Sequence, residues 1–214
     1  QMKDREFFSP ENRKGTNVHF GIREFAMAAI CNGMALHGGI VPYCATFLVF
    51  SDYMKGAIRM SALMKLPVTY VLSHDSIGVG EDGATHEPIE HLAALRATPG
   101  VYTWRPADGH ETAAAYQSAM SVNAPSAIAL SRQNLPLFKE TGKGALKGGY
   151  ILKDGGANPD VILIATGSEV ELAMNAAEEL GKENISARVV SMPCVELFEE
   201  QDAAYRESVL PRSI

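Results

Sequence analysis

The residues with the greatest chemical potential lie together in the segment HDSIGVGEDGATHEP, at positions 74–88. Glycines are interspersed there with titratable side chains, namely His74, Asp75, Glu81, Asp82, His86 and Glu87. Such a polar segment does not suit a buried strand, and its glycines disfavour a helix. We therefore predict a loop whose backbone approaches a ligand while imidazoles and carboxylates face it.

Hydrogen bonding to a polyhydroxylated or phosphorylated ligand is the chemistry that we favour for His74, Asp82 and His86. The alternative is a solvated polar loop. The two histidines could also bind a metal ion, but no cysteine is close and no His-x-x-x-His spacing is present, so we predict no metal ligands. Arg132 follows an apolar run, where a phosphate-binding arginine is expected, and a surface ion pair is its alternative.

Two further groups of residues could contact a ligand. Glu24 lies near the start of an apolar helical segment, where burial would raise its affinity for a proton. Alternatively, the helix dipole or pairing with Arg23 explains its place. Phe47, Phe50 and Tyr53 recur every three residues, which puts them on one side of a helical turn. They could form a stacking platform for a flat heterocycle, or they could pack in the core.

These residues need elements that position them. The apolar run PVTYVLS at 67–73 is expected to be a strand that ends where the polar loop begins, and ligands of open α/β sheets bind beyond such ends. Further strands are expected at 41–46, 101–104, 126–131, 161–165 and 187–191, and helices at 23–37, 51–65, 88–95, 110–122 and 168–181. This alternation predicts an α/β fold, in which a parallel sheet flanked by helices precedes a second, incomplete α/β unit.

Three details of the predicted helices depend on side-chain patterns. The helix at 23–37 is apolar on nearly every face, which predicts that it is buried. Ser51 is expected to cap the next helix, whose inner side would carry Tyr53, Ile58, Leu63 and Met64. The letters SEVE at 168–171 match a capping box, with Ser168 as the cap and Glu171 reaching back.

Composition limits the classes of function. The 214 residues are 46% hydrophobic with a net charge of −6 and no basic cluster, which argues against nucleic acid or a membrane surface as partner. The longest apolar stretch, near 40–50, is too short to span a bilayer, and no signal peptide is visible, so the cytoplasm is expected. The three scattered cysteines predict inert, buried thiols in a reducing compartment.

The motifs of the chain resemble those of the transketolase family. The resemblance rests on GIREFAM, LHGGIVPYCATFLVF, the loop at 74–88, TWRPAD and ALSRQNLP, and continues through GGYIL, ATGSEVELA and VVSMP. It covers nearly the whole chain in the family's order and spacing. The related 1-deoxyxylulose-5-phosphate synthases and two-oxo-acid dehydrogenase subunits share the fold, but not this loop together with this arginine motif.

The resemblance implies thiamine diphosphate-dependent transfer of a two-carbon ketol unit from a ketose phosphate, such as xylulose 5-phosphate, to an aldose phosphate. This reaction would belong to the pentose phosphate pathway. The expected domains are a lead-in at 1–17, a pyrimidine-binding domain at 18–135, a linker at 136–149 and a partial C-terminal domain at 150–214.

For the cofactor, the resemblance implies that Glu24 hydrogen-bonds the aminopyrimidine ring and shares a proton with it. Phe47 would stack on the pyrimidine, and Phe50 and Tyr53 would complete the pocket. Glu24 would therefore be both a cofactor-binding and a catalytic residue.

For the substrate, the resemblance implies that His86 lies near the reacting carbons and acts in catalysis. Asp82 would bind a sugar hydroxyl. His74 and Arg132 would bind the substrate phosphate.

The sequence departs from the family in one important respect. The GDG…N pattern that supplies the diphosphate and Mg²⁺ or Ca²⁺ ligands does not occur, so these ligands are expected in a preceding domain. The family's sites lie between the subunits of a homodimer, so this chain would hold half a site and be inactive alone. The alternatives are a separately encoded subunit, a dihydroxyacetone synthase-type transferase and a non-catalytic dimerisation module.

Overall fold

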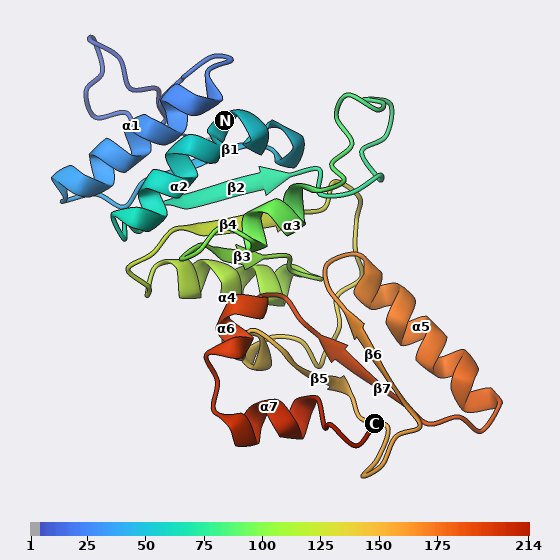
Figure 1. Ribbon diagram of the computed structural model, residues 1–214. Helices are drawn as coiled ribbons and strands as arrows, with labels where there is room; N and C mark the ends of the chain where they lie inside the picture. The colour runs from blue at the N-terminus through green and yellow to red at the C-terminus, as the bar shows by residue number, and fades with distance from the viewer. Residues whose placement is uncertain (1–4) are drawn as a thin grey trace.

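The computed structural model describes residues 5–214, which form two sheets accompanied by helices (Figure 1). The first sheet contains β1 (Tyr43–Phe47), β2 (Thr69–Ser73), β3 (Tyr102–Trp104) and β4 (Ser126–Leu130), in the order β1-β2-β4-β3. All neighbouring strands in it are parallel. The expected parallel sheet flanked by helices is therefore confirmed.

The helices of this first unit lie close to their expected positions. They are α1 (Glu24–His37), the 3-10 helix η1 (Leu48–Met54), α2 (Lys55–Leu63), α3 (His91–Arg96) and α4 (Gly109–Ala119). The segment that was expected to form a single helix after residue 51 is divided between η1 and α2, and its first turns are of the tighter 3-10 type.

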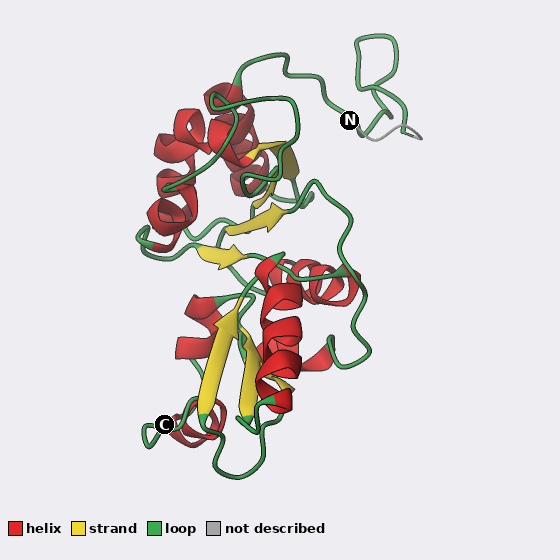
Figure 2. Ribbon diagram, turned by 90° about the vertical axis from the view of Figure 1, so that its right-hand side faces the viewer, coloured by secondary structure: helices red, strands yellow, loops and turns green. Residues whose placement is uncertain are grey.

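The second unit contains a smaller, mixed sheet. Its strands are β5 (Tyr150–Lys153), β6 (Val161–Ala165) and β7 (Ala187–Ser191), in the order β5-β7-β6. β6 pairs with β7 in parallel, whereas β5 pairs with β7 antiparallel. The helix α5 (Glu169–Lys182) packs on β6 and β7, and the two sheets occupy separate halves of the molecule in Figure 2.

Several short elements were not expected from the sequence. They are η2 (Lys143–Lys147), a 3-10 helix inside the segment interpreted as a linker, the antiparallel strand β5, and the helices α6 (Val195–Glu199) and α7 (Ala203–Val209). Each of these elements is too short to show a clear hydrophobic period. The strand β5 is held in place by its contacts with β7 and η2, and not by a local preference of its sequence.

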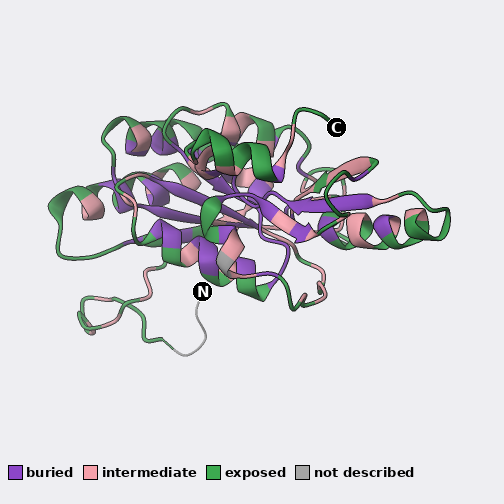
Figure 3. Ribbon diagram, turned by 90° about the horizontal axis from the view of Figure 1, so that it is seen from below, coloured by how far each residue is buried: buried purple, intermediate pink, exposed green. Residues whose placement is uncertain are grey.

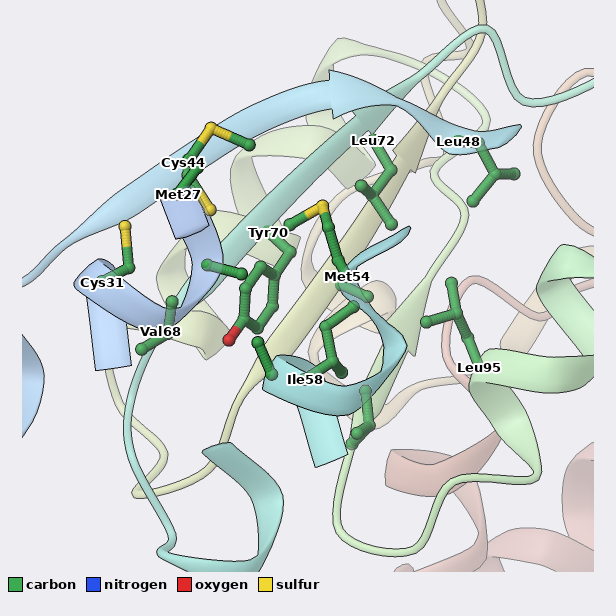
Figure 4. Packing of buried hydrophobic residues seen from close by; sticks show 14 of the residues in the cluster. Met27, Cys31, Cys44, Leu48, Met54, Ile58, Val68, Tyr70, Leu72 and Leu95 are labelled. Atoms are coloured by element: carbon green, nitrogen blue, oxygen red, sulfur yellow. The ribbon is translucent and has the colours of Figure 1, made fainter. Parts of the chain in front are cut away.

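The core of the first unit lies where α1 and α2 cover β1 and β2 (Figure 4). Tyr70 is fully buried there, and its hydroxyl donates to Asn32 Oδ1 at 2.9 Å, so its polar atom is satisfied. Cys31 and Cys44 belong to the same core, and Cys194 is buried at a second cluster. None of the three forms a disulfide, which confirms their expected burial as free thiols.

The prediction that α1 is buried on all sides is wrong. The helix lies on the outside of the first unit, and only one stripe of it is buried, formed by Met27, Ala28, Cys31 and Asn32. Phe25, Ile30 and Leu36 are exposed on the other side, with Leu36 at 66%. Apolar residues on all faces therefore do not correspond to burial within this chain.

The inner face expected for the helix after residue 51 is also wrong. Of the four residues proposed for it, only Ile58 is buried, whereas Tyr53, Leu63 and Met64 are exposed. The 3-10 start of this segment changes the angular position of the side chains that follow. The buried stripe instead consists of Met54, Ala57, Ile58 and Ser61.

The two predicted serine caps do not form. Ser51 lies inside η1, and its buried Oγ has no hydrogen-bond partner. Ser168 precedes α5 with helical backbone angles, φ −60° and ψ −25°, whereas a capping side chain needs a non-helical backbone. Its hydroxyl instead donates to Glu169 and accepts from Arg105, so Glu171 has no capping box to complete.

Residues 5–23 form a loop that reaches away from the sheets and is largely exposed (Figure 3). Backbone hydrogen bonds close it on itself, from Phe8 N to the Asn17 carbonyl at 3.0 Å and from Asn17 N to the Glu6 carbonyl at 3.2 Å. It thus contributes little to the core.

One contact between the two units is a buried carboxylate of α4. Glu111 is fully buried, and it accepts hydrogen bonds from Tyr150 Oη at 2.8 Å, Ser191 Oγ at 2.5 Å and Ala107 N at 2.7 Å. Tyr150 and Ser191 belong to the second sheet. Burial nevertheless raises the pKa of Glu111, because these three donors compensate only in part for lost hydration.

Candidate active site

The carboxyl ends of β1 and β2 bring the first pair of predicted site residues together. Phe47 ends β1 and lies beside Ser73, the last residue of β2, in the parallel register. The Phe47 ring and the following His74 imidazole are stacked, with centroids 3.7 Å apart and planes inclined by 23°. The strand ends therefore place an imidazole directly against an aromatic ring.

The three-residue spacing of the aromatic side chains produces the predicted row. Phe47 and Phe50 are nearly parallel, with centroids 6.0 Å apart and an interplanar angle of 8°. Phe50 and Tyr53 are 6.2 Å apart at 28°. Phe47 and Phe50 are half-buried, while Tyr53 is 66% exposed. These three side chains, called the aromatic row below, form an accessible flat surface from the end of β1 along η1.

The polar loop returns to this row through His86. Its ring makes edge contacts with Phe50, at 5.2 Å between centroids, and with Phe47, at 6.0 Å. Thr85 Oγ1 lies 2.8 Å from His86 Nδ1, which leaves Nε2 for another partner. In Figure 1 the loop extends from the carboxyl end of β2 before the chain enters α3.

His74 adopts an unusual backbone conformation at the start of the loop. Its φ of 61° lies in the left-handed region, which is uncommon for any residue except glycine. Its Nδ1 lies 3.0 Å from Ser73 Oγ. Such conformations persist where the surrounding structure holds them, and they gather at functional sites.

Arg132 reaches the polar loop from the carboxyl end of β4. A Cβ atom added to Gly80 would lie 3.3 Å from the guanidinium carbon, so the two residues are in contact. Gly80 has φ +86°, which also favours glycine. Arg132 is exposed and forms no ion pair within residues 5–214, which does not support the surface ion pair considered as its alternative.

Glu24 and Asp82 are less closely tied to the row. Glu24 is half-buried in the first turn of α1. Arg23 donates to the Phe20 carbonyl at 2.8 Å and does not form an ion pair with Glu24. Asp82 is exposed in the polar loop. Within the described part of the chain, neither carboxylate forms a hydrogen bond or ion pair with the aromatic row.

One polar group beside the site was missed in the sequence. Arg105 and Asp75 form a buried ion pair, with Nε and Oδ2 2.7 Å apart, although 30 residues separate them. Burial opposes the charge of Arg105, but contacts with Glu169 and Asp75 hold its pKa above its ordinary value. The motif TWRPAD contains this arginine, but no local pattern indicated its partner.

Asp52, Glu90 and His91 are the one group of metal-ligating types that the described residues gather closely enough for an ion. His91 Nε2 lies 3.2 Å from Asp52 Oδ2, and Lys55 Nζ lies 2.7 Å from Oδ1 of the same carboxylate. The hydrogen bond from Lys55 lowers the pKa of Asp52. Because a lysine already neutralises this carboxylate, we assign no metal to the group.

Two family models match the chain. The one described as transketolase, pyrimidine binding domain, matches residues 1–137, and the one described as transketolase-like TK C-terminal domain matches residues 148–214. The chain belongs to the transketolase family. The two matched ranges correspond to the two units seen in the fold.

Relatives of this transketolase family member include the chloroplastic transketolase of Solanum tuberosum, which is 59% identical over 211 residues, 96% of this chain and 28% of the relative. Transketolase 1 of Vibrio cholerae is 55% identical over 208 residues, 95% of this chain and 31% of the relative. The chain thus spans about 30% of the length of these curated relatives.

Solved transketolase structures have the same fold. The Pichia stipitis enzyme in complex with sedoheptulose 7-phosphate matches with a TM-score of 0.95 and 46% identity, over 99% of this chain and 32% of that one. An inactive β4 tetramer of a split gene transketolase matches with a TM-score of 0.71 and 32% identity, over 83% of this chain and 57% of that one. In the described residues, no helix is both long and apolar enough to cross a membrane.

Proposed function

We propose that this chain supplies the pyrimidine-binding half of a transketolase site. The observation that carries the proposal is the aromatic row beside two histidines at the carboxyl ends of parallel strands. Thiamine diphosphate is the cofactor that the family implies, and when bound it supplies the carbon centre that carries a two-carbon unit. An accessible row of aromatic rings fits a flat pyrimidine.

We assign cofactor binding to Glu24, Phe47, Phe50 and Tyr53. Phe47 and Phe50 offer half-buried ring faces, and Tyr53 extends the same surface outward. Glu24 offers a half-buried carboxylate that can exchange a hydrogen bond, and a proton, with a ring nitrogen. Its free carboxylate, unpaired with Arg23, supports this role.

We assign substrate binding to His74, Asp82, His86 and Arg132, with His86 also catalytic. The imidazoles can donate to or accept from sugar oxygens at the edge of the row, and the Arg132 guanidinium can bind a phosphate. Solved structures of Pichia stipitis transketolase hold xylulose 5-phosphate, fructose 6-phosphate or sedoheptulose 7-phosphate. We infer that sugar phosphates are also the substrates here, with xylulose 5-phosphate as donor.

The remaining parts of the site belong, in this proposal, to residues outside this chain. They would hold the diphosphate and Mg²⁺ or Ca²⁺, because no ligand set for them is assigned within residues 5–214. The exposed apolar side of α1 supports assembly with another protein surface, which we propose to be a second subunit of a homodimer. We also propose a cytoplasmic location, although some relatives are chloroplastic enzymes.

The test is a ketol-transfer assay from xylulose 5-phosphate to ribose 5-phosphate, with thiamine diphosphate and Mg²⁺. The purified chain is assayed alone and with a separately produced diphosphate-binding half of a close relative. Activity is expected only in the mixture, as the inactive tetramer of a split gene transketolase suggests. Activity of the chain alone would disprove the half-site, and an inactive, demonstrably assembled mixture would disprove the proposed function.

A further inference from the structure

Arg105 links the polar loop to the second unit. Its Nε donates to Asp75 Oδ2 at 2.7 Å, and its Nη1 donates to the Thr166 carbonyl at 2.9 Å and to the Glu169 carboxylate. Its Nη2 donates to Ser168 Oγ at 3.2 Å. One side chain that is 6% exposed therefore connects the first residues of the loop to the turn between β6 and α5.

The backbone around Arg105 strengthens the same connection. Its carbonyl accepts from Gly167 N at 3.0 Å and from Thr166 Oγ1 at 2.9 Å, and its N–H donates to the Pro193 carbonyl at 2.8 Å. Gly167 has φ +58°, and a Cβ there would lie 2.8 Å from the Arg105 side chain. The backbone of the second unit therefore packs closely against Arg105 and hydrogen-bonds to it.

Asp75 depends on Arg105 for its charge balance. Its side chain is 1% exposed, its Oδ2 meets the Arg105 Nε, and its Oδ1 has no hydrogen-bond partner. Without the guanidinium, a carboxylate would be buried alone, which is strongly unfavourable. Asp75 directly follows His74, whose left-handed backbone and stacking on Phe47 need a firm support.

We propose that Arg105 is a positioning residue, through which the second unit fixes Asp75 and thereby holds His74 at the aromatic row. The structural part of this inference stands on its own, while its catalytic part rests on the proposed function. In this view the C-terminal unit contributes to sugar phosphate binding without touching the substrate.

The structural test compares variants of this chain by hydrogen exchange of the amides at 74–88. Arg105→Lys keeps a positive charge but loses the fork that joins Asp75 to Ser168 and Thr166. We expect exchange to become about tenfold faster in the loop, because its anchor opens more often. Glu169→Gln, at a side chain that is 50% exposed, should fold normally and give a smaller increase.

The matched control is Arg188→Lys, since Arg188 is a comparably buried arginine of the second unit that donates to the Ser208 carbonyl and to Asp154. It should alter exchange near α7 but not in the loop. Equal loop exchange in the Arg105 and Arg188 variants, or unchanged loop exchange in both Arg105→Lys and Glu169→Gln, would overturn the proposal.

The catalytic test uses the chain assembled with the diphosphate-binding half. A lost anchor should raise KM for xylulose 5-phosphate, with kcat/KM lowered up to about 100-fold. A merely structural defect would reduce the amount of active enzyme and lower kcat at constant KM. Constant KM in Arg105→Lys would overturn the catalytic part. Faster loop exchange with an assembled but inactive wild type would instead reject the proposed function and leave the anchor standing.

Discussion

At the scale of single residues, the site combines groups that a ligand can reach with groups that only support them. The Phe47 ring contacts both His74 and His86, and Arg132 touches the loop that connects the two histidines. Glu24 is held apart from these contacts and has no ion-pair partner among the described residues. Its carboxylate is therefore available to a ligand, and its role can be tested separately from the row.

Glu24→Gln tests whether this carboxylate takes part in proton transfer. In the assembled enzyme we expect kcat to fall by about 100-fold or more, because glutamine can hydrogen-bond but cannot exchange a proton. Steady-state kinetics and the melting temperature are measured together, since loss of a charge at a helix start costs only about 0.3–1 kcal/mol of stability. Glu171→Gln, at an exposed carboxylate in α5, serves as control. If kcat of Glu24→Gln equals that of the control, Glu24 takes no part in proton transfer and only stabilises the start of α1.

Gly80→Ala tests the contact between the polar loop and Arg132. The variant places a methyl group 3.3 Å from the guanidinium carbon and strains a backbone at φ +86°. We expect KM for xylulose 5-phosphate to rise several-fold as Arg132 is displaced. Gly83→Ala is the matched control, because Gly83 has φ +75° but no atom within 4 Å of the added carbon. Both variants carry strain of about 1–3 kcal/mol, so an equal KM in the two would reject a role for Arg132.

At the scale of elements, parallel strands explain why distant segments meet. β1 and β2 are paired in register, so Phe47 and the loop after Ser73 leave the sheet side by side. η1 then presents its rings from the 3-10 turns that follow β1. The helix α1 covers this part of the sheet with one stripe and leaves its other side apolar and exposed. That exposed side requires an explanation, since large apolar patches mark interaction surfaces.

Ile30→Glu tests whether the outer side of α1 is an interface. Ile30 is 45% exposed between Phe25 and Leu36, which are also exposed. If this side is covered by another chain, burying an unpaired carboxylate there should weaken self-association by about tenfold or more. Sedimentation of the wild type and the variant measures this. Leu172→Glu, at another exposed position in α5, should leave association unchanged, and equal effects would reject the interface.

At the scale of the whole molecule, local patterns predicted every strand except the antiparallel β5, and they predicted the junction between the units poorly. The strands at 161–165 and 187–191 have the expected bounds because each is an apolar run between turn residues. The ion pair of Arg105 with Asp75 and the carboxylate of Glu111 could not be predicted, because their partners lie 30 to 80 residues away. The aromatic row was predictable from its spacing, but the return of His86 to it depends on the loop's path.

The buried carboxylate of Glu111 makes the stability of the chain depend on pH. Burial raises the pKa of Glu111, so the folded chain favours its protonated form more than the unfolded chain does. The resulting stabilisation is fully present below the unfolded pKa of about 4.3 and is lost as pH rises through the folded pKa. Ionised Glu111 keeps its three donors but loses hydration, so the folded chain with ionised Glu111 has a lower free energy of unfolding.

Glu111→Gln removes this titration while keeping the volume of the side chain. Relative to the variant, the wild type should therefore lose stability as pH rises from about 4.3 through the raised pKa, and the difference should level off above it. Urea unfolding of both proteins across a pH series measures the difference in free energy of unfolding. Glu178→Gln, at an exposed position in α5, should track the wild type at every pH. A pH-independent difference between wild type and Glu111→Gln would contradict the prediction, because it would mean that the pKa of Glu111 is the same in the folded and unfolded chains. A relative gain in stability as pH rises would mean that the donors Ser191, Ala107 and Tyr150 hold Glu111 ionised in the folded chain.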